Sequence, residues 1–478
     1  YNTAVGYQAS YSNVGGNLNV AVGINALYEN ESGNRNVAVG YNALKESTGG
    51  SNIAIGNQAA QNTTSPATIT AIGYSALTSN TTGDLNTALG YQALLSNTTG
   101  SGNLAIGPYS LDADTKGNKS IAIGYAALSA QNFTSAQDTY NIAVGYGAGS
   151  TISTGTQNVI IGGLAGDALT TGSNNVAVGT FALTSDDLGS FNTAVGYNTL
   201  ASLNYASGTN SYNTGIGARA GQNISTGVGN TAVGALAGDA ITTASNLTAV
   251  GYGALSTNTI GAENTAIGYH ALVLNVASNR NVAVGTSALY NQTHASGQNA
   301  YNTAVGYGAG YAITSAVYNT IVGGNSGDAL TTGTRNSSLG YAALGAATTG
   351  QYNTAMGSNA LETSTTADHN TAIGYNAGGS VSTGIQNTIV GSLAGDALTT
   401  GNYNVFMGTG SSTNATTAAQ NVAIGRNSYN GTATGSENVV IGDTAGNAMT
   451  SATQNVAIGA RSGNDQTTGF QNAFVGFN

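Results

Sequence analysis

The chain has no cysteine and no tryptophan, only two prolines, and very little charge, and each shortage excludes a class of protein. Without cysteine there can be no disulfides and no thiolate metal sites. Nine lysines and arginines in 478 residues are too few for the basic patch of a nucleic-acid-binding protein. Two prolines exclude a collagen-like chain, and the net charge of −10 is low for a disordered one. No apolar run is long enough to span a membrane, so we expect no membrane insertion in this segment.

One short motif, Asn-x-Ala-(Val/Ile)-Gly, recurs along the whole chain. Of the 27 intervals between its glycines, 23 are 17 residues long, one is 16 and three are 21. We therefore expect a single continuous repeat domain, 1–478, truncated mid-repeat at both ends. The 28 motif glycines are at positions 6, 23, 40, 56, 73, 90, 107, 124, 145, 162, 179, 196, 217, 234, 251, 268, 285, 306, 323, 340, 357, 374, 391, 408, 425, 442, 459 and 476.

The repeat length predicts the fold class. Two helices do not fit into 17 residues, whereas one turn of a β-solenoid does. The motif carries β-branched residues at alternating positions, which favours a short strand, and Gly/Asn/Thr/Ser clusters such as 96–100 (SNTTG) indicate turns. The sequence predicts an all-β, elongated parallel β-solenoid (a β-roll) of about 28 coils, in which equivalent residues stack on one another.

Two positions of the motif are the expected structural ladder. The asparagine four residues before the glycine should pass side-chain hydrogen bonds from coil to coil. The Val or Ile just before the glycine should form an internal apolar column. The ladder residues are Asn2, Asn19, Asn36, Asn52, Asn86, Asn141, Asn158 and Asn192, with Val5, Val22, Val39 and Ile55.

The residue two before the glycine is alanine in 20 copies. Such a uniformly small row suggests that the strand face opposite the Val/Ile column is also covered, by a neighbouring chain. We expect a parallel homo-oligomer, in the simplest case a homotrimer; a flattened monomeric solenoid is the alternative. Six copies place a larger residue at this position, and none of these six has tyrosine after the glycine: Ile160, Ile321, Ile389, Phe406, Val440 and Phe474.

Several polar and aromatic residues are candidates for a further role. Tyrosines after the motif glycine form either a surface contact stripe or a packing ladder: Tyr7, Tyr41, Tyr91, Tyr146, Tyr197 and Tyr269. Aspartates that follow a glycine are weak metal candidates, with a local turn as the alternative: Asp167, Asp239, Asp328 and Asp396. The histidines, His270, His294 and His369, fall in different coils, where we expect exposed turns. Nothing in the sequence specifies a catalytic residue or a cofactor.

The motif also resembles known repeats. The stretches 36–40 (NVAVG), 52–56 (NIAIG) and 421–425 (NVAIG) resemble the heads of YadA-type trimeric autotransporter adhesins, although the spacing here is longer. Stretch 86–100 (NTALGYQALLSNTTG) resembles repeats of phage tail-fibre-like proteins. The resemblance implies a trimeric, extracellular fibre used in adhesion or host attachment.

Together these observations predict a non-enzymatic extracellular fibre protein. It would be the structural or adhesive shaft of a phage tail fibre or of a bacterial cell-surface adhesin filament, located on a cell surface or a virion. Its expected partners are further copies of itself and a cell-surface glycan or receptor. The alternative is a ligand-binding solenoid whose repetitive Thr/Asn/Tyr face binds polysaccharide or ice.

Overall fold

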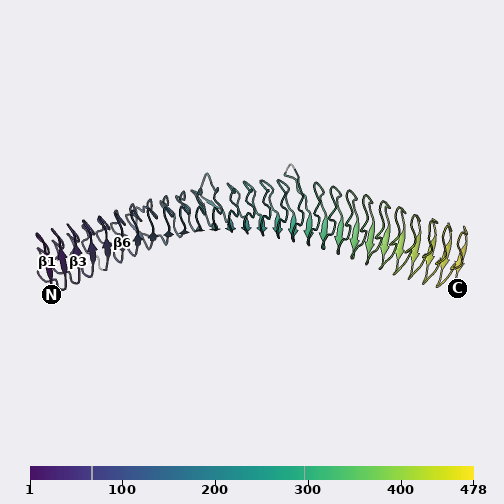
Figure 1. The fold of residues 1–478 in the computed structure, drawn as a ribbon, viewed down its shortest axis with the longest axis horizontal. Coiled ribbons are helices and arrows are strands. Elements are labelled where there is room, and N and C mark those ends of the chain that lie inside the picture. The colour runs from purple at the N-terminus through teal and green to yellow at the C-terminus, as the bar shows by residue number, and fades with distance from the viewer. Residues whose placement is uncertain (66–67, 295–296, 478) are drawn as a thin grey trace. The chain divides into compact units, whose positions relative to one another are not determined.

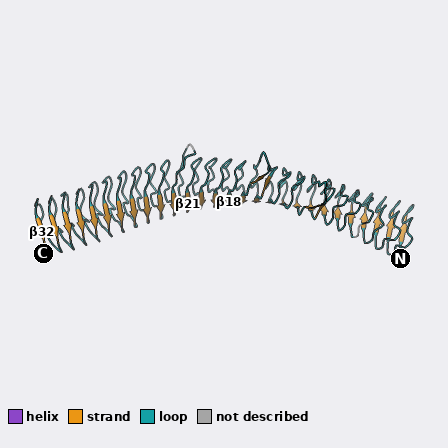
Figure 2. Ribbon diagram, turned by 180° about the vertical axis from the view of Figure 1, so that it is seen from behind, coloured by secondary structure: helices purple, strands orange, loops and turns teal. Residues whose placement is uncertain are grey.

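The structure is a computed structural model that describes residues 1–65, 68–294 and 297–477. These residues form an all-β parallel solenoid of about 28 coils with the predicted period of about 17 residues, and none of them is helical. The chain divides into two compact units, Tyr1–Thr243 and Ala244–Asn478. In each unit the strands follow one side of the coils and the turns form the rest (Figures 1 and 2).

The first unit contains one three-residue strand per coil, which pairs in parallel with that of the next coil at equivalent residues, and four additional two-residue strands. Val20, Ala21 and Val22, for example, lie beside Val37, Ala38 and Val39. The strands are β1 (Thr3–Val5), β2 (Val20–Val22), β3 (Val37–Val39), β4 (Ile53–Ile55), β5 (Thr70–Ile72), β6 (Thr87–Leu89), β7 (Leu104–Ile106), β8 (Gly117–Asn118), β9 (Ile121–Ile123), β10 (Gln137–Asp138), β11 (Ile142–Val144), β12 (Val159–Ile161), β13 (Val176–Val178), β14 (Gly189–Ser190), β15 (Thr193–Val195), β16 (Thr209–Asn210), β17 (Thr214–Ile216) and β18 (Thr231–Val233).

The second unit repeats this arrangement, again with parallel pairs in register; Thr371, Ala372 and Ile373, for example, lie beside Thr388, Ile389 and Val390. The stacking predicted from the 17-residue period is thus confirmed. The strands are β19 (Thr248–Val250), β20 (Thr265–Ile267), β21 (Val282–Val284), β22 (Thr303–Val305), β23 (Thr320–Val322), β24 (Ser337–Leu339), β25 (Thr354–Met356), β26 (Thr371–Ile373), β27 (Thr388–Val390), β28 (Val405–Met407), β29 (Val422–Ile424), β30 (Val439–Ile441), β31 (Val456–Ile458) and β32 (Ala473–Val475).

The motif glycine ends each strand in a conformation that other residues rarely adopt. Gly374 has a φ of +137°, and a Cβ atom placed on it would lie 2.5 Å from the carbonyl oxygen of Gly391 in the next coil. A side chain here would therefore strain the backbone and push two coils apart. This requirement accounts for the glycine in every copy of the motif.

The direction of the strand side chains differs from the prediction. The central alanine of most strands points into the coil and is buried, as in Ala21, whereas the flanking Val20 and Val22 are only half-buried. The predicted ladder residues Val5, Val22, Val39 and Ile55 do stack, but on the outer face of the sheet; Ile55 is 39% exposed. The expectation of an internal Val/Ile column is therefore wrong, and the small size of the alanines reflects a narrow interior within one chain.

Leucines from the turn opposite the strand fill this narrow interior. They lie four residues after the motif glycine and are fully or almost fully buried. With such leucines in place, only a methyl group fits at the centre of most strands. These leucines are Leu27, Leu44, Leu77, Leu94, Leu111, Leu128, Leu183, Leu200, Leu255, Leu272, Leu289, Leu344 and Leu361.

A second type of coil fills the same space differently. It replaces that leucine by glycine and adds a buried aliphatic residue three positions later, as in Gly166 with Leu169 and Gly395 with Leu398. The space left by the glycine also admits a larger strand residue: a Cβ on Gly166 would lie 3.0 Å from Cδ1 of Ile160. The extra volume of a large central strand residue is thus accommodated by the glycine inside the coil. The residue that follows the motif glycine, often tyrosine, does not make this space.

The asparagine ladder is confirmed, and most of its hydrogen bonds involve the backbone. Oδ1 of Asn19 accepts from the backbone N–H of Asn36 in the next coil at 2.9 Å, and Nδ2 of Asn19 donates to the carbonyl of Gly33 at 2.9 Å. In the second unit the side chains also bond to one another, as from Nδ2 of Asn336 to Oδ1 of Asn319 at 3.2 Å. The predicted ladder asparagines from Asn19 to Asn192 are fully buried, so these bonds satisfy amides that would otherwise destabilise the fold.

The insertions of the first two 21-residue intervals lie in the turn region, as predicted, and residues 295 and 296 of the third interval lie outside the described residues. In the first unit two of these insertions add a short parallel pair to the preceding coil, β8 with β10 and β14 with β16. A buried ring anchors each of the three insertions: Phe133, Tyr205 and His294. His294 is only 7% exposed, so the expectation of an exposed turn is wrong for this histidine.

Candidate functional surfaces

The outer face of the strand row is the most regular exposed surface of each unit. Every three-residue strand presents its first and third side chains there, in most coils Thr, Val or Ile, and many third residues are about two-fifths exposed, such as Ile267 at 39% and Ile373 at 39%. A shallow hollow of about 180 Å³ on this face is lined by residues of β23, β24 and β25, including Val322 and Met356. The row of third residues is apolar over the length of each unit, the row of first residues is Thr or Ser in half of the coils, and neither row carries a charged side chain in the described three-residue strands.

The predicted tyrosine stripe also lies on the surface. Tyr7, Tyr41, Tyr91, Tyr146, Tyr197 and Tyr269 are all exposed. Where tyrosines occur in successive coils their rings cover each other: Tyr74 and Tyr91 stack with centroids 5.3 Å apart, as do Tyr125 and Tyr146 at 5.2 Å. Where successive coils carry tyrosine, the rings therefore form the packing ladder weighed from the sequence while remaining exposed, and the contact role stays a prediction.

A second ladder of planar side chains runs along the second unit, five residues before the motif glycine. Arg335 lies between the rings of Tyr318 and Tyr352, 5.4 Å from each centroid, and Tyr352 stacks on His369 at 4.8 Å. At its other end Arg280 donates to the hydroxyl of Tyr301 at 2.6 Å. This ladder is exposed, and the stacking and cation–π contacts between neighbouring coils stabilise it.

The four aspartates proposed as metal candidates occupy the same place in their coils but are not brought together. Each lies four or five coils from the next of the four, and no group of three His, Cys, Asp or Glu side chains that could hold a metal ion occurs among the described residues. The hydroxyl of Thr184 donates to Oδ1 of Asp167 at 2.5 Å. Burial raises the pKa of Asp239, Asp328 and Asp396.

Asp328 differs from the other three because it borders a groove on the second unit. Two adjoining hollows, of about 190 and 310 Å³, share Asn325 and Asp328. The first is also lined by Ser287, Tyr307, Gly308 and Tyr311, and the second by Ala342, Gly345, Ala346, Glu362 and Thr363. Sequence reasoning missed this site; comparing the residues that follow each of the four aspartates by one coil would have shown that only Asp328 is followed by glycine, Gly345.

Two buried carboxylates were also missed. Asp114 and Asp186 are both fully buried, each in the coil before an insertion. Oδ1 of Asp186 accepts from the backbone N–H of Gly189 at 2.9 Å, and Oδ2 accepts from Nδ2 of Asn192 at 3.2 Å. Burial raises the pKa of Asp186 to about 6. Both aspartates stand where several other coils have a buried asparagine, so their role is to close a turn.

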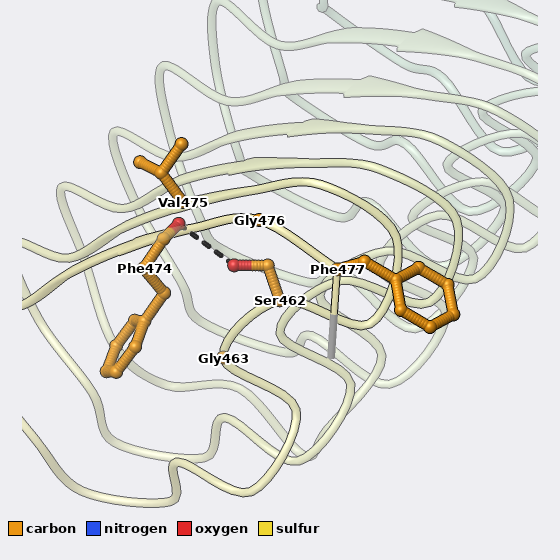
Figure 3. A pocket seen from close by; sticks show the side chains of 6 residues that line it. All are labelled: Ser462, Gly463, Phe474, Val475, Gly476 and Phe477. Atoms are coloured by element: carbon orange, nitrogen blue, oxygen red, sulfur yellow. Dashed lines mark hydrogen bonds between the residues drawn. The ribbon is translucent and has the colours of Figure 1, made fainter.

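One further hollow, of about 260 Å³, lies at the last described coil (Figure 3). Phe474 and Phe477 line it, and the hydroxyl of Ser462 donates to the carbonyl oxygen of Phe474 at 2.9 Å. Equivalent residues of earlier coils are covered by the following coil, so this hollow reflects its place in the stack and gives no argument for a ligand.

Comparison with known proteins adds no assignment, because no family model, no curated protein and no solved structure matches the chain. A search of the described residues for a helix with the length and hydropathy of a membrane span finds none.

Proposed function

We propose that this chain is a non-enzymatic, extracellular fibre protein, the shaft of a tail fibre or of a cell-surface adhesin filament, and that it works as a parallel homo-oligomer. Its role is to display a repetitive surface at a distance from its attachment point. The observation that carries this proposal is the outer face of the strand row, which is uncharged and has a continuous apolar row of third residues.

That face is the place where copies of the chain would meet. Flat, uncharged rows of Val, Ile and Thr that continue over many coils are unusual on an isolated soluble chain, and large apolar patches are typical of interaction sites. A second copy in parallel orientation would match it coil for coil, because both chains share the same repeat. Three such faces can close around an axis, which makes a trimer the simplest assembly.

The composition supports exposure outside a cell. Only nine lysines and arginines occur in the chain, so trypsin-like proteases find few cleavage sites. Each coil is also tied to the next by backbone hydrogen bonds on all its sides, which favours resistance to local unfolding. Cysteine is absent, so this resistance does not depend on the redox conditions.

The test is the mass of the chain in solution, measured by light scattering and native mass spectrometry. We expect a trimer, and we expect the double variant Val305→Asp/Val390→Asp to be monomeric with an unchanged far-UV spectrum, because two carboxylates would be forced into the interface. The control, Thr349→Asp, places a charge on an exposed turn and should leave the mass unaltered. A monomeric wild-type chain at micromolar concentration would refute the oligomer.

A further inference from the structure

We propose that the groove around Asp328 binds a short segment of a neutral glycan, which lies along the coils between Tyr307 and Glu362. This inference deepens the adhesive part of the proposed function and rests on it, but the groove lies on a face other than the strand row. Glycan binding and oligomer formation can therefore succeed or fail separately.

The first step of the argument is that glycines open this groove. In the coil after Asp167 a threonine, Thr184, covers the aspartate and donates to its carboxylate. The coils after Asp239 and Asp396 have Ser256 and Thr413 at the same place. After Asp328 the equivalent residue is Gly345, and a Cβ added there would lie 3.6 Å from Oδ1 of Asp328. Asp328 thus borders a hollow, and the next coil has no side chain at this place.

The second step concerns the aromatic walls. Tyr307 is 67% exposed, and the next coil has Gly324 in the tyrosine column, so no ring pair within the described chain includes Tyr307. Tyr311 stacks on Tyr290 with centroids 5.1 Å apart; that is its one ring contact among the described residues. Free ring faces beside a hollow suit the C–H faces of sugar rings.

The third step concerns the polar groups. Asp328 and Glu362 are two coils apart, about 10 Å along the stack, with Gly345 between them. Glu362 is held in place by Nδ2 of Asn359 at 2.6 Å. The side chains of Asn325 and Ser287 form no hydrogen bond within the described residues, so they are available to a ligand. Carboxylate and amide oxygens are good acceptors for sugar hydroxyls.

The charge of the groove narrows the class of ligand. Its lining contains two acidic side chains and no basic one, so phosphate, sulfate and uronic acid groups would be repelled. The combined size lies within the range of about 300–1,000 Å³ that is usual for ligand sites. Because the hollows follow one another from coil to coil, an extended oligosaccharide fits better than a compact monosaccharide.

The experiment uses the full chain and a panel of neutral hexasaccharides: maltohexaose, cellohexaose, laminarihexaose, xylohexaose and mannohexaose. Binding is measured by calorimetry and by saturation-transfer NMR at millimolar sugar. We expect at least one sugar to bind, and we expect Gly345→Thr, which introduces the residue found at two equivalent places, to weaken binding by about tenfold or more. Asp328→Asn should also weaken it.

Two matched controls separate the groove from the fold. Ser256→Thr and Asp396→Asn make comparable changes in the same columns outside the groove, and both should bind as the wild-type chain does. The mass in solution of all four variants should equal that of the wild type. The inference is refuted if no sugar of the panel binds, or if Gly345→Thr binds as well as the wild-type chain does. Because the groove is acidic, the cation spermidine is tested as well, and binding of spermidine without binding of any sugar would also refute the inference.

Discussion

Asp186 illustrates how a single residue can depart from the repeat. Asn258, at the same place in another coil, accepts from the backbone N–H of Gly261 and also donates to the carbonyl of Gly261 at 2.7 Å. Asp186 keeps the first kind of bond, to Gly189, but when ionised it has no proton to donate. Its burial therefore disfavours the charged form and raises its pKa to about 6.

This shift predicts that the chain is more stable in mild acid. The folded state holds the proton of Asp186 more tightly than the unfolded state does, so the stabilisation is complete below the usual value of 3.8 and is lost as the pH rises through about 6. We expect Asp186→Asn to raise the free energy of unfolding at about pH 7.5 by on the order of 3 kcal/mol, with little change at about pH 4. Urea unfolding at both pH values measures this.

Asp465→Asn removes the same charge at an exposed site and serves as the control, which should leave the pH profile unaltered. Some acid stabilisation should persist in Asp186→Asn, because burial also raises the pKa of Asp112, Asp239, Asp328 and Asp396. Equal free energies of unfolding for Asp186→Asn and wild type at neutral pH would contradict the conclusion that the buried charge of Asp186 destabilises the folded chain.

The motif glycine allows a second prediction at this scale. Gly374→Ala should lower the free energy of unfolding by about 3 kcal/mol or more, because its φ of +137° strains any side chain and the new methyl group meets the next coil. Gly163→Ala is the matched control, since a Cβ there meets nothing within 4 Å. Thermal or urea unfolding should show a large loss for the first variant and almost none for the second.

At the scale of the coil, the two interior arrangements are alternative solutions to one packing problem. Leucine four residues after the motif glycine is replaced, in the other type, by glycine with an aliphatic residue three positions later. The coil of Leu361 has the first arrangement, and three residues after this leucine lies Ser364, whose buried hydroxyl has no hydrogen-bond partner. The next coil has the second arrangement, with Gly378 and Val381 at the same two positions. The second arrangement should therefore be transferable to the coil of Leu361.

A double-mutant cycle tests this exchange. Leu361→Gly should cost about 2–5 kcal/mol by leaving a cavity, and Ser364→Ile should cost about 1–3 kcal/mol by overpacking. In the double variant the isoleucine fills the space, so we expect a favourable coupling of about 2 kcal/mol or more, measured by urea unfolding. Additive effects would show that the two positions do not share the same space.

The sequence predicted the strand of each coil, its register and the asparagine ladder, because these depend only on residues that repeat at a fixed spacing. It did not predict which face of the strand points inward. Alternation separates Ala from Val and Ile but does not say which side encloses the core, and hydrophobicity favoured the wrong one. The deciding residues are leucines such as Leu361, which adopt a positive φ of 51° in a turn and reach the interior from the opposite side.

The groove could be predicted only in part, for a related reason. The repeat position that Asp328 and Gly345 share can be aligned from the sequence, but the sequence does not tell which repeat positions border one another around the coil. Tyr307 and Asp328 come from different columns and different coils. Their proximity follows from the path of the turns, which depends on several residues with positive φ in each coil.

At the scale of the whole chain, stability should be a sum over coils and their nearest neighbours. Removing residues 405–421, one complete coil, joins Asn404 to Val422 and preserves every column. We expect this variant to fold, with the same far-UV spectrum per residue. Its m value, the slope of the free energy of unfolding against urea concentration, should be slightly smaller. Removing residues 405–413 instead would shift all later columns, and we expect that chain to unfold or aggregate.

The asparagine ladder has a consequence for how such a chain can grow or shrink over evolutionary time. Most ladder asparagines form the same kind of hydrogen bonds to the neighbouring coils. A duplicated whole coil can therefore form these bonds as well, whereas a partial coil leaves buried amides without hydrogen-bond partners. Length should therefore change most readily by whole turns, and extra residues are accepted where they leave the ladder intact, as in the three 21-residue intervals.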